Sequence, residues 1–457
     1  MDVKLIFLFL YFFGMLAIGI QSALKIKKPD DFYLAGKRSK TMYITGSLLA
    51  TIIGSSAILG TINLSYSQGW AAAWLMLCAS IGCFALLPMA KYVSRYGKYT
   101  LPQLVGDFYG KTAERVCSVI IPVAWIGVIA AQVIGAAMII SGYIGISYEL
   151  AVLLTGAIFI LYTMIGGQIS VIKTDFVQTI MIFVGLFVFA LFLHKHSPIN
   201  SFATIHETFP FNQHFTPWNL VVLLFTYSST FFVGPDIYSR LFCAKSEKTA
   251  SKSVLMTAIL LFFFAFLIAF VGVSLAHLFP NIDSSKTISL ITAIDKYLPP
   301  WVSGLVIAAF LSAVLSSAST TLLTSSTILS EPILKRKKGE GKFSTKNTRI
   351  FILILGIAAM VLALKITSII GALLIALTLF SGAFIIPIAA GLFGFRVVKK
   401  TGVAAMIIGG AIALSGKITA LSYNDTLGNI IIICGFIANA AVLFLPNMVK
   451  KGIGDRV

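Results

Sequence analysis

Residues 43–65 read YITGSLLATIIGSSAILGTINLS, an uncharged run of membrane-spanning length that is interrupted near its centre by Gly54-Ser55-Ser56. A helical bilayer crossing takes about 20 predominantly apolar residues, so this run predicts a transmembrane helix. Glycine and serine at its centre predict a break that exposes backbone carbonyl and amide groups within the membrane.

The rest of the chain has the same character. Of its 457 residues, 58% are hydrophobic and 11% are charged, where a soluble domain carries about 25%. We predict an all-α polytopic membrane protein, a single integral membrane domain over 1–457, with about 13 transmembrane helices. The predicted segments are 3–23, 43–65, 70–90, 115–142, 148–166, 174–193, 217–239, 253–277, 302–329, 348–364, 367–394, 402–416 and 428–446.

The net charge of +19 has a membrane explanation. Of the 35 Lys and Arg residues, 29 lie in the connections that follow odd-numbered segments. Because cytoplasmic loops are enriched in Lys and Arg, we predict a cell-membrane protein with its N-terminus outside and its C-terminus in the cytoplasm. The charges therefore indicate no nucleic-acid partner.

The predicted order of segments contains two groups of five, 43–193 and 217–394, which begin on opposite sides of the membrane. This arrangement predicts an inverted repeat, with an extra N-terminal helix at 3–23 and two C-terminal helices at 402–446. Gly234-Pro235 interrupts the first segment of the second group, as Gly54 interrupts that of the first. Paired breaks indicate a midplane binding site, whereas ordinary glycine packing is the alternative.

A run of hydroxyl residues follows in segment 302–329. Ala313, Ser316 and Ser317 stand at i, i+3 and i+4 and share one helix face. Two hydroxyls together with carbonyl oxygens from the break near Ala50 and Ile53 suit a sodium ion. Alternatively, the serines only permit close helix packing and bond to their own backbone.

Few acidic residues lie near the membrane interior. Asp175 is either a functional buried acid or a cap at the start of segment 174–193. Asp236 precedes Arg240 by four residues, which predicts an ion pair within one helix. The sequence contains no nucleophile elbow, phosphate-binding loop or zinc-protease motif, so it does not predict an enzyme.

Four stretches together resemble the sodium:solute symporter family, which includes carriers of sugars, proline, sialic acid and choline. They are DFYLAGKR at 31–38, GGQISVIKTDFVQ at 166–178, GPDIYSRLFCAKS at 234–246, and the helix with Ser316-Ser317. The resemblance implies a LeuT-type fold with five plus five inverted helices, one additional N-terminal helix and two additional C-terminal helices.

The resemblance also implies two ion sites. The first contains backbone oxygens of Ala50, Ile53 and Ala313 and the hydroxyls of Ser316 and Ser317. Some relatives hold a second sodium at positions that correspond here to Asp175, Ser316, Ser319 and Thr320.

The sequence leaves the solute unidentified but favours a small polar or zwitterionic molecule. It would face Thr51, Ser55, Ser56, Gln132 and Tyr227. We therefore predict a sodium-coupled symporter that imports this solute by alternating access, with sodium as the coupling ion, no cofactor, and the lipid bilayer as its surroundings. The alternatives are a carrier-like membrane sensor and a passive channel. The sequence does not determine the oligomeric state.

Overall fold

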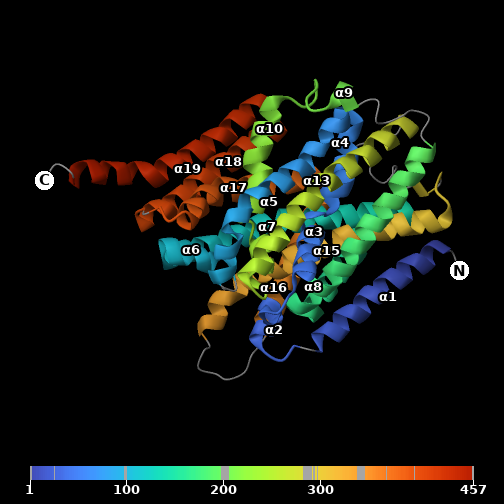
Figure 1. Ribbon diagram of the computed structural model, residues 1–457, viewed down its shortest axis with the longest axis horizontal. Coiled ribbons are helices and arrows are strands. Elements are labelled where there is room, and N and C mark those ends of the chain that lie inside the picture. The colour runs from blue at the N-terminus through green and yellow to red at the C-terminus, as the bar shows by residue number, and fades with distance from the viewer. Residues whose placement is uncertain are drawn as a thin grey trace.

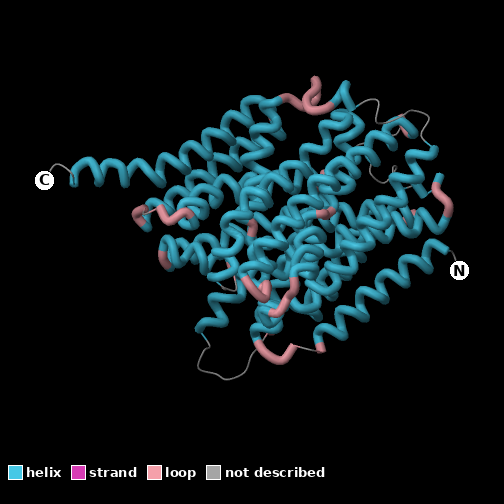
Figure 2. Tube along the Cα trace, viewed as in Figure 1, coloured by secondary structure: helices cyan, strands magenta, loops and turns pink. Residues whose placement is uncertain are grey.

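The computed structural model describes residues 3–24, 26–96, 100–196, 205–280, 291, 294–295, 297–336, 345–366, 368–395 and 397–454. Every regular element within these ranges is a helix, as Figures 1 and 2 show. The helices form one bundle, and α1 (Val3–Ala23) lies along its side. The all-helical prediction is confirmed.

The helices of the first half of the chain include several short pieces between long ones. After α1 they are α2 (Pro29–Leu34), η1 (Ala35–Lys37), α3 (Thr41–Ile52), η2 (Ser56–Gly60), α4 (Thr61–Gln68), η3 (Gly69–Ala73), α5 (Trp74–Tyr96), α6 (Leu101–Tyr109), α7 (Lys111–Ile144) and α8 (Tyr148–His196).

The second half of the chain likewise contains short helical pieces between long helices. Its helices are α9 (Ile205–Thr208), α10 (Pro217–Leu223), η4 (Leu224–Ser228), α11 (Ser229–Val233), α12 (Pro235–Phe242), α13 (Glu247–Leu278), α15 (Pro300–Arg336), α16 (Lys346–Lys365), α17 (Ile369–Leu392), α18 (Lys399–Ser422) and α19 (Asp425–Gly454).

Ten helical segments of the described chain are long and apolar enough to cross a membrane. Large apolar side chains such as Phe13, Leu161, Phe263 and Ile437 are exposed on the outside of the bundle. A soluble protein rarely exposes so much apolar surface, whereas lipid tails cover it without cost. The chain is a multi-pass membrane protein, and the count of 13 crossings stays a prediction.

Both predicted breaks are present. α3 ends at Ile52, and the chain resumes after Gly54 with a π-helical turn, η2, followed by α4. In the second case α10, the π-helical turn η4 and α11 end at Gly234, whose φ of −64° and ψ of 132° are extended. Pro235 then begins α12, in the position where proline is well tolerated.

The predicted end of segment 148–166 coincides with a break, but the next segment begins earlier than the predicted residue 174. α8 runs from Tyr148 to His196, and Gly167 is its one described residue with non-helical φ and ψ (56° and −173°). The part of α8 after the break therefore begins just beyond Gly167. The residues between 166 and 174 are helical, and the polar ones among them, including Gln168 and Ser170, are buried.

The two C-terminal helices pack closely on each other and on α17. Glycines form this contact, because a Cβ added at Gly409 would lie 2.5 Å from the carbonyl oxygen of Gly382, and one at Gly428 would lie 2.3 Å from the backbone nitrogen of Ala420. α19 also contacts α10. Residues of both C-terminal helices therefore line one side of a cavity.

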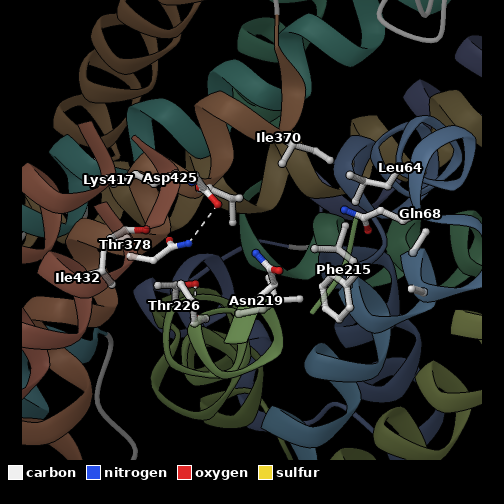
Figure 3. A pocket seen from close by; sticks show the side chains of 17 residues that line it. Leu64, Gln68, Phe215, Asn219, Thr226, Ile370, Thr378, Lys417, Asp425 and Ile432 are labelled. Carbon is white, nitrogen blue, oxygen red and sulfur yellow. Dashed lines mark hydrogen bonds between the residues drawn. The ribbon is translucent and has the colours of Figure 1, made fainter. Parts of the chain in front are cut away.

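This cavity has a volume of about 190 Å³ and is shown in Figure 3. It lies among the end of α4, the beginning of α5, the first turns of α10 and α17, and the turn that joins α18 to α19. Below we call it the outer cavity, because the charge distribution predicts that these ends face outside.

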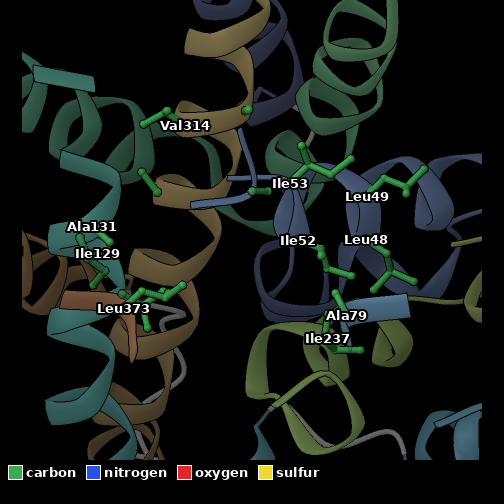
Figure 4. Close-up of a cluster of buried hydrophobic side chains, with 14 of the residues drawn as sticks. Leu48, Leu49, Ile52, Ile53, Ala79, Ile129, Ala131, Ile237, Val314 and Leu373 are labelled. Carbon is green, nitrogen blue, oxygen red and sulfur yellow. The ribbon is translucent and has the colours of Figure 1, made fainter. Parts of the chain in front are cut away.

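The middle of the bundle is a continuous buried apolar cluster. Figure 4 shows part of it around the end of α3, where Leu48, Ile52 and Ile53 pack near Ile237 of α12 and Ala79 of α5. This packing fixes the two broken helices against α7 and α15. Polar groups left by the breaks are thus held in defined positions.

Candidate functional site

The hydroxyls of Ser316 and Ser317 bind the broken end of α3. Ser316 Oγ donates to the carbonyl oxygen of Ala50 at 2.8 Å and lies 3.0 Å from that of Ala313. Ser317 Oγ lies 3.1 Å from the carbonyl oxygen of Ala50 and 3.0 Å from that of Thr51. Because α3 stops at Ile52, its last carbonyls have no partner within the helix and are available to α15.

Four of the five residues predicted for the first sodium site are joined by these bonds. The fifth, Ile53, is the residue that follows α3, and it is fully buried. A hydroxyl can rotate its hydrogen away and present a lone pair instead. The cluster therefore offers uncharged oxygens from two helices, the type of donor that a small monovalent cation requires.

Asp175 lies in the interior of α8, eight residues after Gly167, and its side chain is fully buried. Its Oδ2 accepts a hydrogen bond from Ser47 Oγ at 2.5 Å and lies 3.5 Å from Arg240 Nη2. Its Oδ1 has no hydrogen-bond partner among the described residues. The helix-cap interpretation is wrong, because the residue is two turns beyond the break.

Arg240 is also fully buried and forms the centre of a polar network between α3, α8, α12 and α15. Its Nε lies 3.2 Å from Ser47 Oγ, and its Nη2 donates to Thr320 Oγ1. The predicted ion pair between Asp236 and Arg240 is wrong, since the guanidinium turns to Asp175. Of the other second-site residues, Ser319 donates to the carbonyl oxygen of Ser316 at 3.1 Å.

A second, smaller cavity of about 60 Å³ lies between the breaks of the two interrupted helices. We call it the inner cavity. A space of this size holds a few water molecules. Of the residues predicted to face the solute, four line it: Thr51, Ser56, Gln132 and Tyr227.

Ser55, the fifth residue predicted to face the solute, forms a hydrogen bond with Gln132, another of these residues. Its backbone N–H donates to Gln132 Oε1 at 2.8 Å, and its hydroxyl donates to the carbonyl oxygen of Ala131 at 2.9 Å. An amide of the broken helix thus orients the Gln132 side chain. Ser55 is a positioning residue in this structure.

Gly54 connects the inner cavity with the Ser316-Ser317 cluster. A Cβ at this position would lie 2.7 Å from Ser317 Oγ and 2.8 Å from Gln132 Oε1. Real Cβ atoms do not approach side-chain oxygens so closely, so any larger residue here would displace Ser317 or Gln132. Ser317 itself lines the inner cavity, so a candidate cation ligand and a candidate solute ligand both lie beside this one glycine.

Sequence reasoning missed the lower wall of the inner cavity. Trp125 and Asp236 both line it, and Trp125 Nε1 donates to Asp236 Oδ2 at 2.6 Å. Asp236 Oδ1 has no hydrogen-bond partner among the described residues. The available signal was its position directly after the Gly234-Pro235 break, where the amide groups of a new helix favour a carboxylate.

The geometry combines two interrupted helices, a cluster of uncharged oxygens at one break and a polar cavity between both breaks. A profile of the sodium:solute symporter family matches residues 32–409. The chain belongs to the sodium:solute symporter family. It is therefore a transporter and not an enzyme, and its family couples solute movement to sodium.

Curated relatives in this symporter family match over most of their length. The osmoregulated proline transporter OpuE of Bacillus subtilis is 25% identical over 465 residues, covering 97% of this chain and 94% of the relative. The sodium/proline symporter of Haemophilus influenzae is 25% identical, with 98% and 95% covered. The sodium/pantothenate symporter of Escherichia coli is 25% identical, with 84% and 83% covered.

Solved symporter structures share the fold. A sodium-coupled sialic acid symporter in a substrate-bound outward-open state superposes with a TM-score of 0.81 at 18% identity, with 97% of each chain covered. A nucleobase-cation-symport-1 family transporter gives a TM-score of 0.59 at 11% identity, with 91% of this chain and 96% of that chain covered. The predicted LeuT-type fold is confirmed.

Proposed function

We propose that this symporter imports a small polar or zwitterionic solute across the cell membrane, driven by the sodium gradient, with its N-terminus outside and its C-terminus in the cytoplasm. The observation that supports this most is the pair of serines on α15 bonded to the broken end of α3. Sodium bound there would hold α3 and α15 together. These two helices must separate when the site opens to the opposite side of the membrane.

The first sodium site in this proposal contains the carbonyl oxygens of Ala50, Ile53 and Ala313 and the hydroxyls of Ser316 and Ser317. Four of these groups already lie within hydrogen-bonding distance of one another. Binding favours the conformation in which α3 and α15 are in contact. Coupling requires only this differential affinity for two conformations.

The solute would occupy the inner cavity, with Thr51, Ser56, Gln132 and Tyr227 as polar contacts and Ser55 holding Gln132. A cavity of about 60 Å³ must widen for any organic solute. Gly54 lies against both Ser317 and Gln132. Widening of the inner cavity for the solute and binding of sodium at Ser317 therefore both act on Gly54.

A second sodium would bind at Asp175 with Ser316, Ser319 and Thr320. In the described conformation Arg240 contacts both Asp175 and Thr320. The guanidinium and a second sodium are therefore alternative partners of one carboxylate, because two cations at the same oxygens would repel each other strongly in a buried site. The Oδ1 of Asp175, for which the described part of the chain offers no hydrogen-bond partner, supports the ion proposal, whereas Arg240 limits it to conformations in which the guanidinium moves.

Uptake into proteoliposomes tests the proposed function. The protein is reconstituted, and accumulation of labelled proline, glycine betaine and pantothenate is measured with a sodium gradient and with potassium replacing sodium. We expect one of these solutes to accumulate above its external concentration only with sodium. Equilibration without accumulation would indicate a passive channel, and binding without any uptake would indicate a sensor.

A further inference from the structure

A groove of about 600 Å³ lies on the outside of the bundle and is lined by residues that include Leu24 after α1, Phe32 of α2, Leu161 of α8 and Arg349 of α16. We call it the side groove. Binding sites for organic ligands have volumes of about 300 to 1,000 Å³, so the groove has room for more than water. Leu24 and Leu161 are 78% and 61% exposed, so the groove opens towards the surroundings of the bundle. In a membrane those surroundings are lipid.

The side groove lies at one end of the membrane-spanning part of the bundle. Its polar lining residues, Thr345 and Arg349, are at the start of α16, a helix long and apolar enough to cross a membrane. The first turn of such a helix is near a bilayer surface. Figure 1 shows α2 and α16 at the same end of the bundle, where α1 also ends. The other lining residues are apolar, so the groove has a polar end at the depth of lipid head groups and an apolar wall at the depth of acyl chains.

Positive charge is concentrated around this polar end. Arg349 is exposed, and no ion pair among the described residues engages its guanidinium. Lys27 and Lys28 lie in the turn between α1 and α2, and Lys346 is one turn before Arg349. Residues 26–38 and 345–349 together carry six Lys and Arg against two Asp, a net charge of +4. This charge attracts an anion to the groove.

The two acids of this region do not neutralise the charge inside the groove. Asp31 Oδ2 accepts from the backbone N–H groups of Lys27 and Lys28, at 3.2 and 3.1 Å. Its Oδ1 lies 3.9 Å from Arg38 Nη2. The carboxylate of Asp31 is thus engaged by its own segment, and neither Asp31 nor Asp30 lines the side groove.

We propose that the side groove binds one anionic phospholipid, with its phosphate at Arg349 and an acyl chain along the apolar wall formed by α1 and α8. A guanidinium donates two parallel N–H bonds to phosphate oxygens. The first N–H groups of α16 have no partner within the helix, and the side chain of its N-cap, Thr345, does not bond to them. The positive end of the helix dipole therefore also favours the phosphate. The site is separate from the inner cavity and needs neither solute nor sodium.

Charge distinguishes an anionic lipid from a zwitterionic one at this site. Phosphatidylcholine also carries a phosphate, but its trimethylammonium group would enter a region with a net charge of +4 and be repelled. Phosphatidylglycerol brings the phosphate without a cation. Basic pockets between transmembrane helices are typical sites for anionic head groups. We therefore expect selectivity for the head group in addition to the ordinary contact of lipid with the bundle.

Lipid in the side groove also covers the break in α8. Phe32 lines the groove, and its ring packs on Gly167, because a Cβ at Gly167 would lie 2.6 Å from Phe32 Cδ2. An acyl chain in the groove would contact Phe32 together with residues of α1 and α8. It would thereby hold these three helices together around the break. Because lipid binds here only when the helices are assembled, its binding should raise the unfolding temperature.

Native mass spectrometry of the purified protein tests the site directly. The protein in a mild detergent is mixed with equal amounts of dioleoyl phosphatidylglycerol and dioleoyl phosphatidylcholine, and the lipid-bound species are quantified. We expect one phosphatidylglycerol to bind severalfold more tightly than phosphatidylcholine. Arg349→Gln should reduce this preference about fivefold, the effect of removing one cation near an anionic lipid, and Arg349→Lys should retain most of it. Lys400→Gln, the same change of charge at the exposed start of α18, should have no effect.

A second variant tests the apolar wall. Leu161→Trp places a bulky side chain in the groove at an exposed position, so the fold should be retained while phosphatidylglycerol binds severalfold more weakly. Equal binding of the two lipids by the wild type would overturn the proposal. So would a preference that is undiminished in Arg349→Gln, or binding that Leu161→Trp leaves unchanged.

Thermal unfolding separates the lipid from a free anion. We expect phosphatidylglycerol to raise the unfolding temperature of the wild type by a few degrees, and Arg349→Gln to lose most of this rise. Inorganic phosphate should not raise it, and an equal rise with phosphate would overturn the assignment to a lipid. These measurements use neither sodium nor solute. Their failure would therefore leave the proposed symport intact, and a failure of sodium-driven uptake would leave the lipid site intact.

Discussion

At the scale of single residues, the arrangement depends on side chains that are small and polar. Ser316 and Ser317 contact three different carbonyl groups, two of which belong to α3. Larger side chains would separate α3 from α15, and apolar ones would leave the carbonyls of the broken helix without partners inside the membrane. The hydroxyls satisfy both requirements while remaining exchangeable for an ion.

Replacing Ser316 and Ser317 together by Ala removes both hydroxyls but keeps the volume small and the helix propensity high. We expect the protein to fold and the apparent sodium affinity of uptake to fall by about tenfold or more, since each lost hydroxyl ligand removes on the order of 1 kcal/mol. Ser325→Ala is the matched control, because among the described residues Ser325 donates to the carbonyl oxygen of Thr321 of its own helix. An unchanged sodium dependence in the double variant would show that the assignment is wrong.

Asp175 gives a prediction on stoichiometry. If it binds a second sodium, uptake by the wild type has a sodium Hill coefficient above one, and Asp175→Asn brings the coefficient towards one while uptake remains sodium-driven. If Arg240 stays on the carboxylate throughout the cycle, the wild-type coefficient is one at saturating solute. Glu149→Gln, in the first turn of α8, is the control for the loss of an acid.

At the scale of elements, the breaks in the two interrupted helices have different steric causes. Gly54 is required by side chains, those of Ser317 and Gln132, whereas Gly234 faces backbone. A Cβ at Gly234 would lie 2.3 Å from the carbonyl oxygen of Thr230. The conformation of the first break therefore depends on the side chains and ligands beside it. The conformation of the second break depends on the backbone of its own helix.

We expect Gly54→Leu to abolish solute binding in purified protein while reducing expression much less. The added side chain must displace Gln132 or Ser317, both of which line the inner cavity. Gly14→Leu is a suitable control, since a Cβ at Gly14 of α1 would meet no atom within 4 Å. Solute affinity is measured by calorimetry or by scintillation proximity. A normal affinity in Gly54→Leu would show that this glycine serves only ordinary helix packing.

Whether a feature could be predicted from the sequence depends on how far apart along the chain the interacting residues lie. The breaks follow from Gly54 and Gly234-Pro235, and the Ser316 and Ser317 face follows from helical spacing, because both are local properties of the chain. The partner of Arg240 is not local. Helical spacing indicated Asp236, four residues away, but Asp175 lies 65 positions earlier and reaches the guanidinium through tertiary packing.

At the scale of the whole molecule, the predicted orientation can be tested by cysteine labelling. Cys434 is the exposed cysteine and the other four are buried. In a Cys434→Ser background, Asn424→Cys in the turn between α18 and α19 should react with an impermeant maleimide added to intact cells. Lys400→Cys, at the other end of α18, should react only after lysis. The reverse pattern would invert the topology and place the outer cavity on the cytoplasmic side.

The π turn η4 has a mechanical consequence for the inner and outer cavities. A π turn contains one residue more than an α turn, and each residue of an α-helix turns the chain by about 100°. If the surplus residue moves along the helix, the side chains it passes rotate by about this angle. Thr226 and Tyr227 lie within η4, one on each cavity. The helix can therefore exchange the groups that face the solute by a screw motion, with little bending of its axis.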